Sequence, residues 1–243
     1  MIVLKDVWKS FEEKVVLQDI STVFETGKIN LVIGASGHGK SVLMRSMVGL
    51  IDIDKGSISY DNRELDFENY DQTREIRRDI GMLFQGAALF NSLSVQDNVE
   101  FPLKMFTTLT KEERLERINF CLKHVNLENA NRKFPAELSG GMRKRVGIAR
   151  AIALDIKYLF CDEPNSGLDP ITSRVIDNLI KDITEEFNIT TIINTHDMKT
   201  VFDIGDNIVF IYNGLKWWEG SKNDVKTSNN TELQNFLNAS YLI

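Results

Sequence analysis

A glycine-rich loop between an apolar strand and a helix constrains this 243-residue chain more than any other feature. The loop covers residues 34–41, reads GASGHGKS and fits the pattern G-x-x-x-x-G-K-[ST]. A strand-like apolar run at residues 30–33 precedes it, and a helical pattern at 42–50 follows it. A phosphate-binding loop needs both neighbours, because the helix then directs its free N–H groups at the ligand. The sequence therefore predicts a phosphate site on a strand–loop–helix unit.

The residue types in the loop suit a bound polyphosphate. Its glycines let backbone N–H groups point inward, Lys40 is expected to bridge the β and γ phosphates, and Ser41 is expected to offer its hydroxyl to Mg²⁺. His38 is expected to be a tolerated loop residue rather than a catalyst. A plain glycine-rich turn is the alternative, and the flanking strand and helix argue against it. The residues expected to bind nucleotide here are Gly34, Ser36, Gly37, Gly39, Lys40, Ser41 and Val42.

Composition excludes several classes of protein. Hydrophobic residues make up 42% and charged residues 26%, as in an ordinary soluble globular protein. The net charge of −6 offers no basic field for nucleic acid. Cys121 and Cys161 have no second pair, which argues against a disulfide framework or zinc site. Apolar runs are far shorter than the roughly twenty residues of a spanning helix, so we expect a cytoplasmic chain that does not cross a membrane.

The spacing of apolar residues predicts an α/β fold. Short β-prone runs fill the first sixty residues, and helical spacing follows between about 95 and 133, with a capping box at Thr110 and Glu113. Strands at 158–161, 190–194 and 207–212 then alternate with helices at about 170–187 and 198–204, which predicts a mostly parallel sheet. The polar segment 221–230 is expected to be loosely ordered.

Two acids at the end of a buried strand supply the other half of a phosphate-transfer site. Residues 158–163 read YLFCDE, so Asp162 can hold the Mg²⁺ shell while Glu163 orients and deprotonates an attacking water. Alone, such a pair would indicate a solvated turn. Together with the phosphate loop, it favours a nucleotide-hydrolysing enzyme.

A second helix start can also receive phosphate. Ser139 and the two glycines after it open a helix expected over about 140–154, whose free N–H groups form a second dipole end. The alternative is an ordinary N-capped helix. Arg143, Lys144 and Arg145 are expected on its solvated face rather than in a nucleic-acid patch.

The order of these motifs resembles that of the ATP-binding subunits of ABC transporters. Their LSGG signature is matched at residues 138–141, their D-loop by SGLD at 166–169, and their Q-loop by MLFQ at 82–85. The resemblance, which runs from about residue 2 to 220, implies a P-loop NTPase: a RecA-like core, an N-terminal antiparallel β subdomain and an inserted α-helical subdomain. It implies an ATP-binding domain at 1–222, with the helical subdomain at about 92–150, and a short tail at 223–243.

The resemblance also implies roles for single residues. Glu163, His196 and Gln85 would be catalytic, with His196 as the switch histidine, and Gln85 would join Ser41 and Asp162 at the metal. ATP and Mg²⁺ would be the cofactors. Two copies would pack head to tail, so that the signature of one contacts nucleotide held by the other. The implied nucleotide contacts beyond the phosphate loop are Phe11, Ser139, Gly140, Gly141 and Asp169.

Three positions carry open questions. Phe11 stands where the family stacks an aromatic ring on adenine, and Trp8 is the alternative. Val42 replaces a usual Ser or Thr, so one contact to phosphate is missing and lower nucleotide affinity is expected. Asn165 replaces a small residue or Thr, and no role follows for it from the sequence.

The segment 82–103, MLFQGAALFNSLSVQDNVEFPL, resembles a narrower group, the ATPases of Mla-type phospholipid transporters. In that group it grips a coupling helix of the permease, a contact that Ala88, Leu89 and Phe90 would suit, although Leu89 can instead close the core. The implied partners are an integral MlaE-like permease and a membrane-anchored lipid-binding subunit, with the ATPase peripheral on the cytoplasmic face of the inner membrane.

Other readings stay open. Amino-acid import, lipoprotein release and soluble iron–sulfur assembly use related ATPases. The apolar tail residues are expected to pack on the chain's own body; they are Leu233, Phe236, Leu237, Tyr241 and Leu242.

Overall fold

The computed structural model describes residues 1–241, without the side chains at positions 70, 240 and 241. The strands are β1 (Ile2–Phe11), β2 (Lys14–Phe24), β3 (Ile29–Ile33), β4 (Lys55–Tyr60), β5 (Arg63–Glu64), β6 (Ile80–Leu83), β7 (Tyr158–Asp162), β8 (Thr190–Thr195), β9 (Asn207–Tyr212) and β10 (Leu215–Ser221). The helices are α1 (Lys40–Met47), α2 (Tyr70–Arg78), α3 (Val95–Phe106), α4 (Lys111–His124), the 3₁₀ turn η1 (Pro135–Glu137), α5 (Gly140–Ala151), α6 (Pro170–Glu186), α7 (Met198–Ile204), α8 (Lys222–Thr227) and α9 (Thr231–Tyr241).

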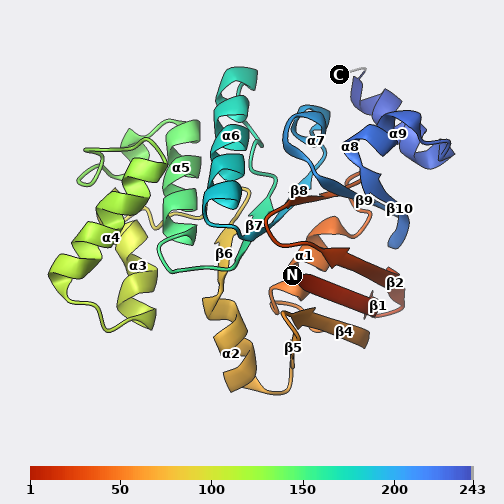
Figure 1. Cartoon of the computed structure of the whole chain (residues 1–243), viewed down its shortest axis with the longest axis horizontal. Helices are drawn as coiled ribbons and strands as arrows, with labels where there is room; N and C mark the ends of the chain where they lie inside the picture. The colour runs from red at the N-terminus through yellow and green to blue at the C-terminus, as the bar shows by residue number, and fades with distance from the viewer. Residues whose placement is uncertain (242–243) are drawn as a thin grey trace.

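Two sheets form the body of the molecule (Figure 1). The first has the order β2-β1-β4-β5 and is antiparallel. The second has the order β10-β9-β3-β8-β7-β6, in which β9 to β6 are parallel and β10 is antiparallel at one edge. The predicted fold class, a mostly parallel α/β core with an antiparallel N-terminal sheet, is confirmed.

Strand β3 is buried on both faces, and its side chains contribute to two separate hydrophobic core clusters. Ile29, Leu31 and Ile33 belong to the larger cluster, which reaches α5, α6 and α7. Val32, pointing the other way because strand side chains alternate, belongs to the cluster that joins α1 to both sheets. The phosphate loop therefore leaves a strand that is buried at every position, which fixes where the loop begins.

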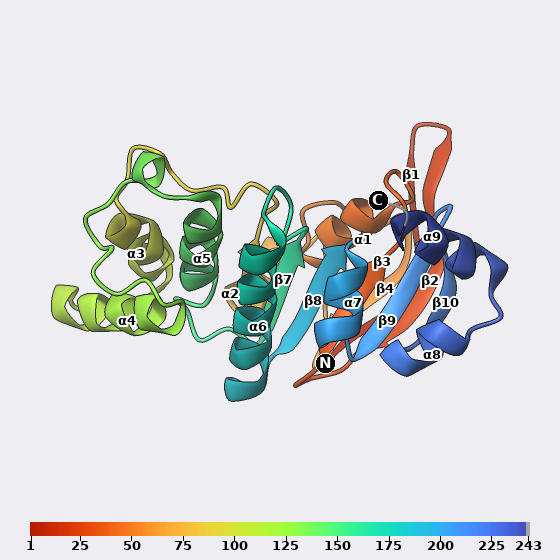
Figure 2. The same cartoon turned by 90° about the horizontal axis from the view of Figure 1, so that it is seen from above.

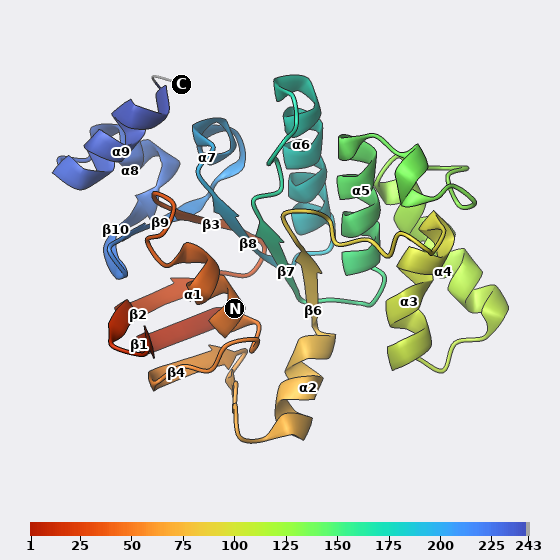
Figure 3. The ribbon, with the colours of Figure 1, turned by 180° about the vertical axis from the view of Figure 1, so that it is seen from behind.

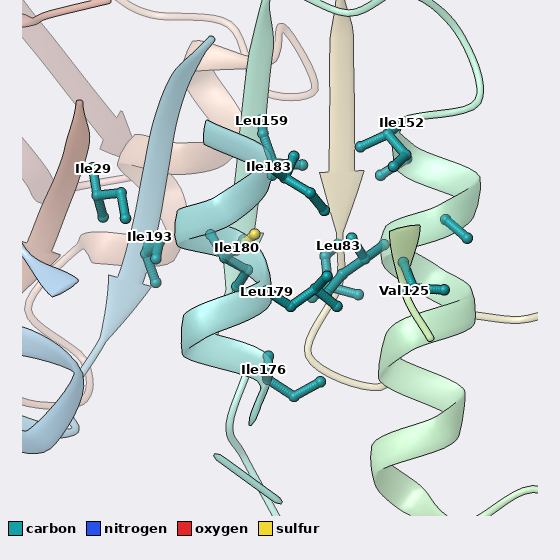
Figure 4. Close-up of a cluster of buried hydrophobic side chains, with 14 of the residues drawn as sticks. Ile29, Leu83, Val125, Ile152, Leu159, Ile176, Leu179, Ile180, Ile183 and Ile193 are labelled. Carbon is teal, nitrogen blue, oxygen red and sulfur yellow. The ribbon is translucent and has the colours of Figure 1, made fainter. Parts of the chain in front are cut away.

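Helices α3, α4 and α5 group beyond the β6 edge of the sheet (Figures 1 and 2). The predicted capping box opens α4, with Thr110 and Glu113 each bonded to the other's backbone. Figure 4 shows Leu83 of β6 among side chains from both neighbouring helices, with Leu179 and Ile183 from α6 on one side and Ile152 at the end of α5 on the other. This packing joins the helical group to the sheet.

The tail differs in part from the expectation. Segment 221–230 is not loosely ordered, because a capping box between Ser221 and Asp224 starts α8. Leu233 and Leu237 of α9 are buried in the larger core cluster, so packing on the chain's own body is confirmed for them. The side chain of Tyr241 and the whole of Leu242 lie outside the described residues.

Two further expectations concern membrane-spanning helices and the cysteines. No helix within residues 1–241 has the length and apolar character needed to span a membrane. Cys121 and Cys161 are buried free thiols, and burial raises the pKa of Cys121 to about 11.

Candidate active site

The phosphate loop connects the end of β3 to the start of α1. Gly39 is the N-cap with φ 104°, and no side chain of the described residues caps the helix, so its first N–H groups are left for a ligand. Gly34 has φ 145°, and a Cβ there would lie 2.3 Å from the carbonyl oxygen of Ile211. Only glycine therefore fits at this position.

The exposed rim of the loop is formed by Ser36 and Gly37, and nothing lies within 4 Å of the place a Gly37 Cβ would take. His38 packs edge-on against Tyr212, with ring centroids 5.1 Å apart, and its carbonyl accepts from the Gly214 N–H at 3.2 Å. Val42 is partly buried and packs on the core cluster around α1.

Lys40 is buried with its ammonium directed back over the loop. Nζ donates to the carbonyl oxygens of Gly34 at 2.7 Å and Ala35 at 3.0 Å. Burial lowers the pKa of Lys40, while the charges of Glu163 and Asp162 act to raise it. The cation thus faces the acids across the space where a polyphosphate would lie.

Asn194, at the end of β8, joins two of the predicted metal ligands. Its Nδ2 donates to Asp162 Oδ1 at 2.6 Å and lies 3.4 Å from Ser41 Oγ. Its Oδ1 is buried and has no hydrogen-bond partner among the described residues. Three oxygen-bearing side chains therefore converge here, and Mg²⁺ takes such hard oxygen ligands. The residues present fit a magnesium site.

Glu163 follows β7 in a left-handed conformation, φ 48°, which is unfavourable for a residue with a Cβ. Its N–H donates to the Asn194 carbonyl at 2.9 Å. Its Oε1 lies 2.8 Å from Nδ1 of His196, so the structure pairs the predicted base with the predicted switch histidine. Glu163 and His196 follow the adjacent parallel strands β7 and β8, in which Asp162 pairs with Asn194.

Gln85 lies just after β6 and reaches the same region by two contacts. Nε2 donates to Ser166 Oγ at 3.1 Å, and the Gln85 carbonyl accepts from Lys144 Nζ. The expectation that Lys144 lies on a solvated face is wrong, because it is buried, and Arg145 is only partly exposed. Arg143 is exposed as expected.

The signature residues form the start of α5. Ser139 Oγ accepts from the Met142 N–H at 3.2 Å, and Gly141 packs so closely on Thr172 that a Cβ would come within 2.4 Å of its methyl group. Asp169 caps α6 through the Ile171 and Thr172 N–H groups. Strand β7 stands between α1, which the phosphate loop opens, and α5, which Ser139 caps, in Figures 1 to 3.

The aromatic candidates for adenine differ in exposure. Phe11 is 44% exposed at the end of β1, with Lys9 Nζ 5.4 Å from its ring centroid. Trp8 is more covered, and Lys55 lies 5.7 Å from its ring. The hairpin that carries Phe11 also contacts the phosphate loop, because a Cβ at Gly39 would lie 2.8 Å from the Val16 carbonyl. Phe11 stays the prediction.

A buried network next to Glu163 went unrecognised in the sequence. Asn165 Nδ2 donates to Asp177 Oδ1 at 2.8 Å and lies 3.0 Å from Thr200 Oγ1, which donates to Asp177 Oδ2 at 3.0 Å. Burial raises the pKa of Asp177 to about 6, although both hydrogen bonds act to lower it. The network ties the loop after Glu163 to α6 and α7.

The residues that sequence reasoning missed are Asn194, Lys144 and the Asn165 network. Asn194 carries a weak signal, a polar residue at the end of an apolar strand. Lys144 carries a clearer one, because it lies three residues after Gly141 and four before Ile148, on the buried stripe of α5.

Comparisons with known proteins agree with this geometry. The family model for ABC transporters matches residues 17–166. The methionine import ATP-binding protein MetN of Clostridium tetani is 41% identical over 211 residues, 87% of this chain and 66% of that protein. The probable ribonucleotide transport ATP-binding protein mkl of Mycobacterium tuberculosis is 36% identical over 230 residues, which are 95% of this chain and 64% of that protein. The chain thus spans about two thirds of the length of these relatives.

Solved structures show the same fold. The dimeric structure of MJ0796, a bacterial ABC transporter cassette, has a TM-score of 0.83 and 32% identity, covering 91% of this chain and 99% of that one. Another MJ0796 structure is a post-hydrolysis state bound to ADP and Pi. The structure of cbiO1 from Clostridium perfringens, part of the ABC transporter complex cbiONQ, has a TM-score of 0.87 and 28% identity, covering 99% of this chain and 97% of that one. The chain therefore belongs to the ABC transporter family and is one of its ATP-binding, ATP-hydrolysing cassettes.

Proposed function

We propose that this chain is the ATPase subunit that powers phospholipid transport between the inner and outer membranes through a permease partner. The single observation that carries the transport role is the junction at Gln85, where the nucleotide site continues directly into an exposed aromatic surface.

The polyphosphate of ATP would lie over the phosphate loop. The uncapped start of α1 and the inward N–H groups bind phosphate oxygens, and Lys40 would exchange its loop carbonyls for the β and γ phosphates. Phe11 would stack on the adenine ring. Mg²⁺, held by Ser41, Asp162 and Gln85, would neutralise charge on the phosphates.

Hydrolysis would depend on the Glu163–His196 pair. The 2.8 Å contact holds the Glu163 carboxylate in one direction, so it can accept a proton from a water placed in line with the γ-phosphate. His196 would then stabilise charge that develops on the phosphate oxygens. Asn194 keeps Asp162 and Ser41 in register with this pair.

A second copy would complete each site. The free N–H groups at the start of α5 have no phosphate to bind within their own chain, because α5 and α1 lie on opposite sides of β7. In a head-to-tail pair, Ser139 and Gly141 of one copy would meet nucleotide on the loop of the other. The MJ0796 cassette, 32% identical to this chain, has a dimeric structure, which supports the pairing of two copies.

The proposed permease surface is the apolar set Phe84, Phe90, Phe101 and Met105, each at least 39% exposed. The rings of Phe90 and Phe101 lie 4.8 Å apart. Buried Asn98, in the VQDNV run at residues 95–99, accepts from the Phe90 N–H and donates to the Phe90 carbonyl, so it holds the surface in place. An amphipathic coupling helix would find apolar anchors here.

Arg150 stabilises the loop between Gln85 and Phe90. Its guanidinium donates to the carbonyls of Ala87 and Ala88, both at 2.8 Å, and both alanines have positive φ. These bonds restrain the loop next to Gln85. Because the loop is rigid, a movement of Gln85 on ATP binding would also displace Phe90.

Phospholipid is proposed as cargo because of the resemblance of segment 82–103. Amino-acid import is the second candidate, supported by 41% identity to a protein named for methionine import. The relatives named above differ in their stated cargo, so overall similarity of the cassette does not choose between them.

The test of hydrolysis compares the purified chain with Glu163→Gln. We expect the variant to bind ATP like the parent and to lose at least about a hundredfold in turnover, because the base is gone while the loop is intact. Normal turnover by the variant would remove Glu163 from this role.

The test of transport is affinity purification from detergent-solubilised membranes, followed by mass spectrometry. We expect an integral permease together with a membrane-anchored lipid-binding subunit. A permease with a soluble solute-binding protein would support amino-acid import instead, and recovery without any integral membrane protein would contradict a transport role. A matched control carries Phe90→Glu, which should lose the permease and keep ATP binding.

A further inference from the structure

A buried cation connects the start of α5 to the catalytic loops. Lys144 is 5% exposed, and its Nζ donates to the carbonyl oxygens of Gln85 and Glu163, the latter at 3.2 Å. Both acceptors are backbone atoms of residues that follow adjacent parallel strands, β6 and β7. One ammonium therefore bridges two segments that the proposed mechanism uses.

The bridge matters most for Glu163, whose backbone is strained at φ 48°. Contacts on both sides of its Cα hold that conformation: the N–H donates to the Asn194 carbonyl, and the Glu163 carbonyl accepts from Lys144 Nζ and from the Ser166 N–H at 3.1 Å. Without Lys144, only the local turn to Ser166 restrains the peptide after Glu163. The carboxylate would then lose its fixed direction toward His196.

Lys144 belongs to the second turn of the helix that Ser139 caps. A helix moves as a stiff unit, so a shift or rotation of its N-terminal end displaces Nζ relative to both carbonyls. In the proposed dimer that N-terminal end touches the nucleotide held by the other copy. The state of one site is thus connected to the geometry of the next by a single side chain.

We propose that Lys144 is a positioning residue that couples engagement of α5 with a second copy's nucleotide to the alignment of Gln85 and Glu163 in its own site. The inference rests on the proposed ATPase function and deepens it. Burial lowers the pKa of Lys144, whereas Cys161, Glu163 and Asp162 act to raise it.

Arg145 provides a matched control on the same helix. Its Nη1 also donates to two carbonyls, those of Val125 at 3.2 Å and Asn126 at 2.9 Å. Those carbonyls follow α4 and lie outside the site. Arg145→Met therefore removes a comparable structural contact without touching Gln85 or Glu163.

The experiment measures kcat, KM for ATP and the melting temperature of the full chain, Lys144→Met, Lys144→Arg and Arg145→Met. We expect Lys144→Met to lower kcat roughly tenfold or more, since small displacements of reacting groups have effects of this size, and to leave KM within about threefold. Lys144→Arg, which keeps the charge and the donors, should recover part of the loss. Arg145→Met should lower the melting temperature and leave kcat within about twofold.

A second readout does not depend on turnover. In a Glu163→Gln background, ATP-induced dimerisation measured by light scattering should persist in Lys144→Met, because the phosphate loop and Ser139 are unchanged. If Lys144→Met does not yield soluble protein, Lys144→Gln replaces it, with a donor one bond shorter and a smaller expected fall in kcat.

Two results would overturn the coupling: a folded Lys144→Met with parental kcat, or equal losses of kcat in Lys144→Met and Arg145→Met. Loss of ATP-induced dimerisation in Lys144→Met would also overturn it, by showing a defect in assembly instead of alignment. These results differ from failure of the proposed function, which would show as absence of ATP hydrolysis by the unmodified chain.

Discussion

Asp177 offers a prediction whose sign and size follow from its surroundings. The carboxyl group is 3% exposed, and burial raises its pKa from an ordinary value of 3.8 to about 6. Between these two values the folded protein holds a proton that the unfolded chain has lost. The free energy of unfolding therefore falls as pH rises through this window, and above pH 6 the folded state carries an ionised buried carboxylate.

The full penalty is about 3 kcal/mol, because one pKa unit corresponds to about 1.4 kcal/mol. Roughly 1.4 kcal/mol of it develops between pH 5 and pH 8. Asp177→Asn cannot ionise, and its amide can donate to Asn165 Oδ1, which lacks a partner among the described residues, once the Asn165 amide turns over. The free energy of unfolding of Asp177→Asn minus that of the parent should therefore rise with pH by this amount.

Urea unfolding at pH 5, 6, 7 and 8 measures the difference, and subtraction of the parent removes the titration of other groups. Asp182→Asn, the same substitution at an exposed position of the same helix, is measured as the control. A flat difference for Asp177→Asn, or one that falls with pH, would refute the reasoning.

Three further predictions test the site and its supports. Asn194→Ala should raise the Mg²⁺ concentration for half-maximal ATPase activity about tenfold, because Asp162 and Ser41 lose their shared partner; an unchanged Mg²⁺ titration would argue against the metal assignment. Gly34→Ala should abolish binding of a fluorescent ATP analogue, since its Cβ would lie 2.3 Å from a backbone oxygen; parental affinity would mean the loop tolerates another path. Asn98→Ala should lower the free energy of unfolding by about 2 kcal/mol, because the Phe90 N–H and the Leu93 carbonyl lose their side-chain partner, measured by urea unfolding; a loss under about 1 kcal/mol would contradict this role of Asn98.

The parts of the site that lie close together in sequence could be predicted from it. The phosphate loop is one continuous segment, so Lys40 and Ser41 follow from spacing alone. Asp162 and Glu163 follow because a buried strand ends in two acids. The Glu163–His196 contact could be expected only through the family resemblance, since the two residues come from different strands.

The rest depends on partners far away in the chain. Lys144 meets the Gln85 carbonyl 59 residues away, and its two arginine neighbours suggest a solvated face. Asn165 needs Asp177 and Thr200 to become a network, and these come from two separate helices. The helix α8 was missed for a local reason: its composition is polar, and its capping box uses Asp224 instead of the more usual Glu or Gln.

The pairing of β3 also determines when a newly made chain can become active. Ile29 pairs with Thr191 and Asn30 with Asn207, so the strand before the phosphate loop has no neighbours in the sheet until most of the chain exists. At about 5 to 20 residues per second, a ribosome needs roughly ten to thirty-five seconds to reach β9 after making β3. During that interval the apolar face of β3 is open to chaperones and to misassociation. Nascent chains stalled before β8 should therefore fail to retain ATP, even though they already contain every residue of the phosphate loop.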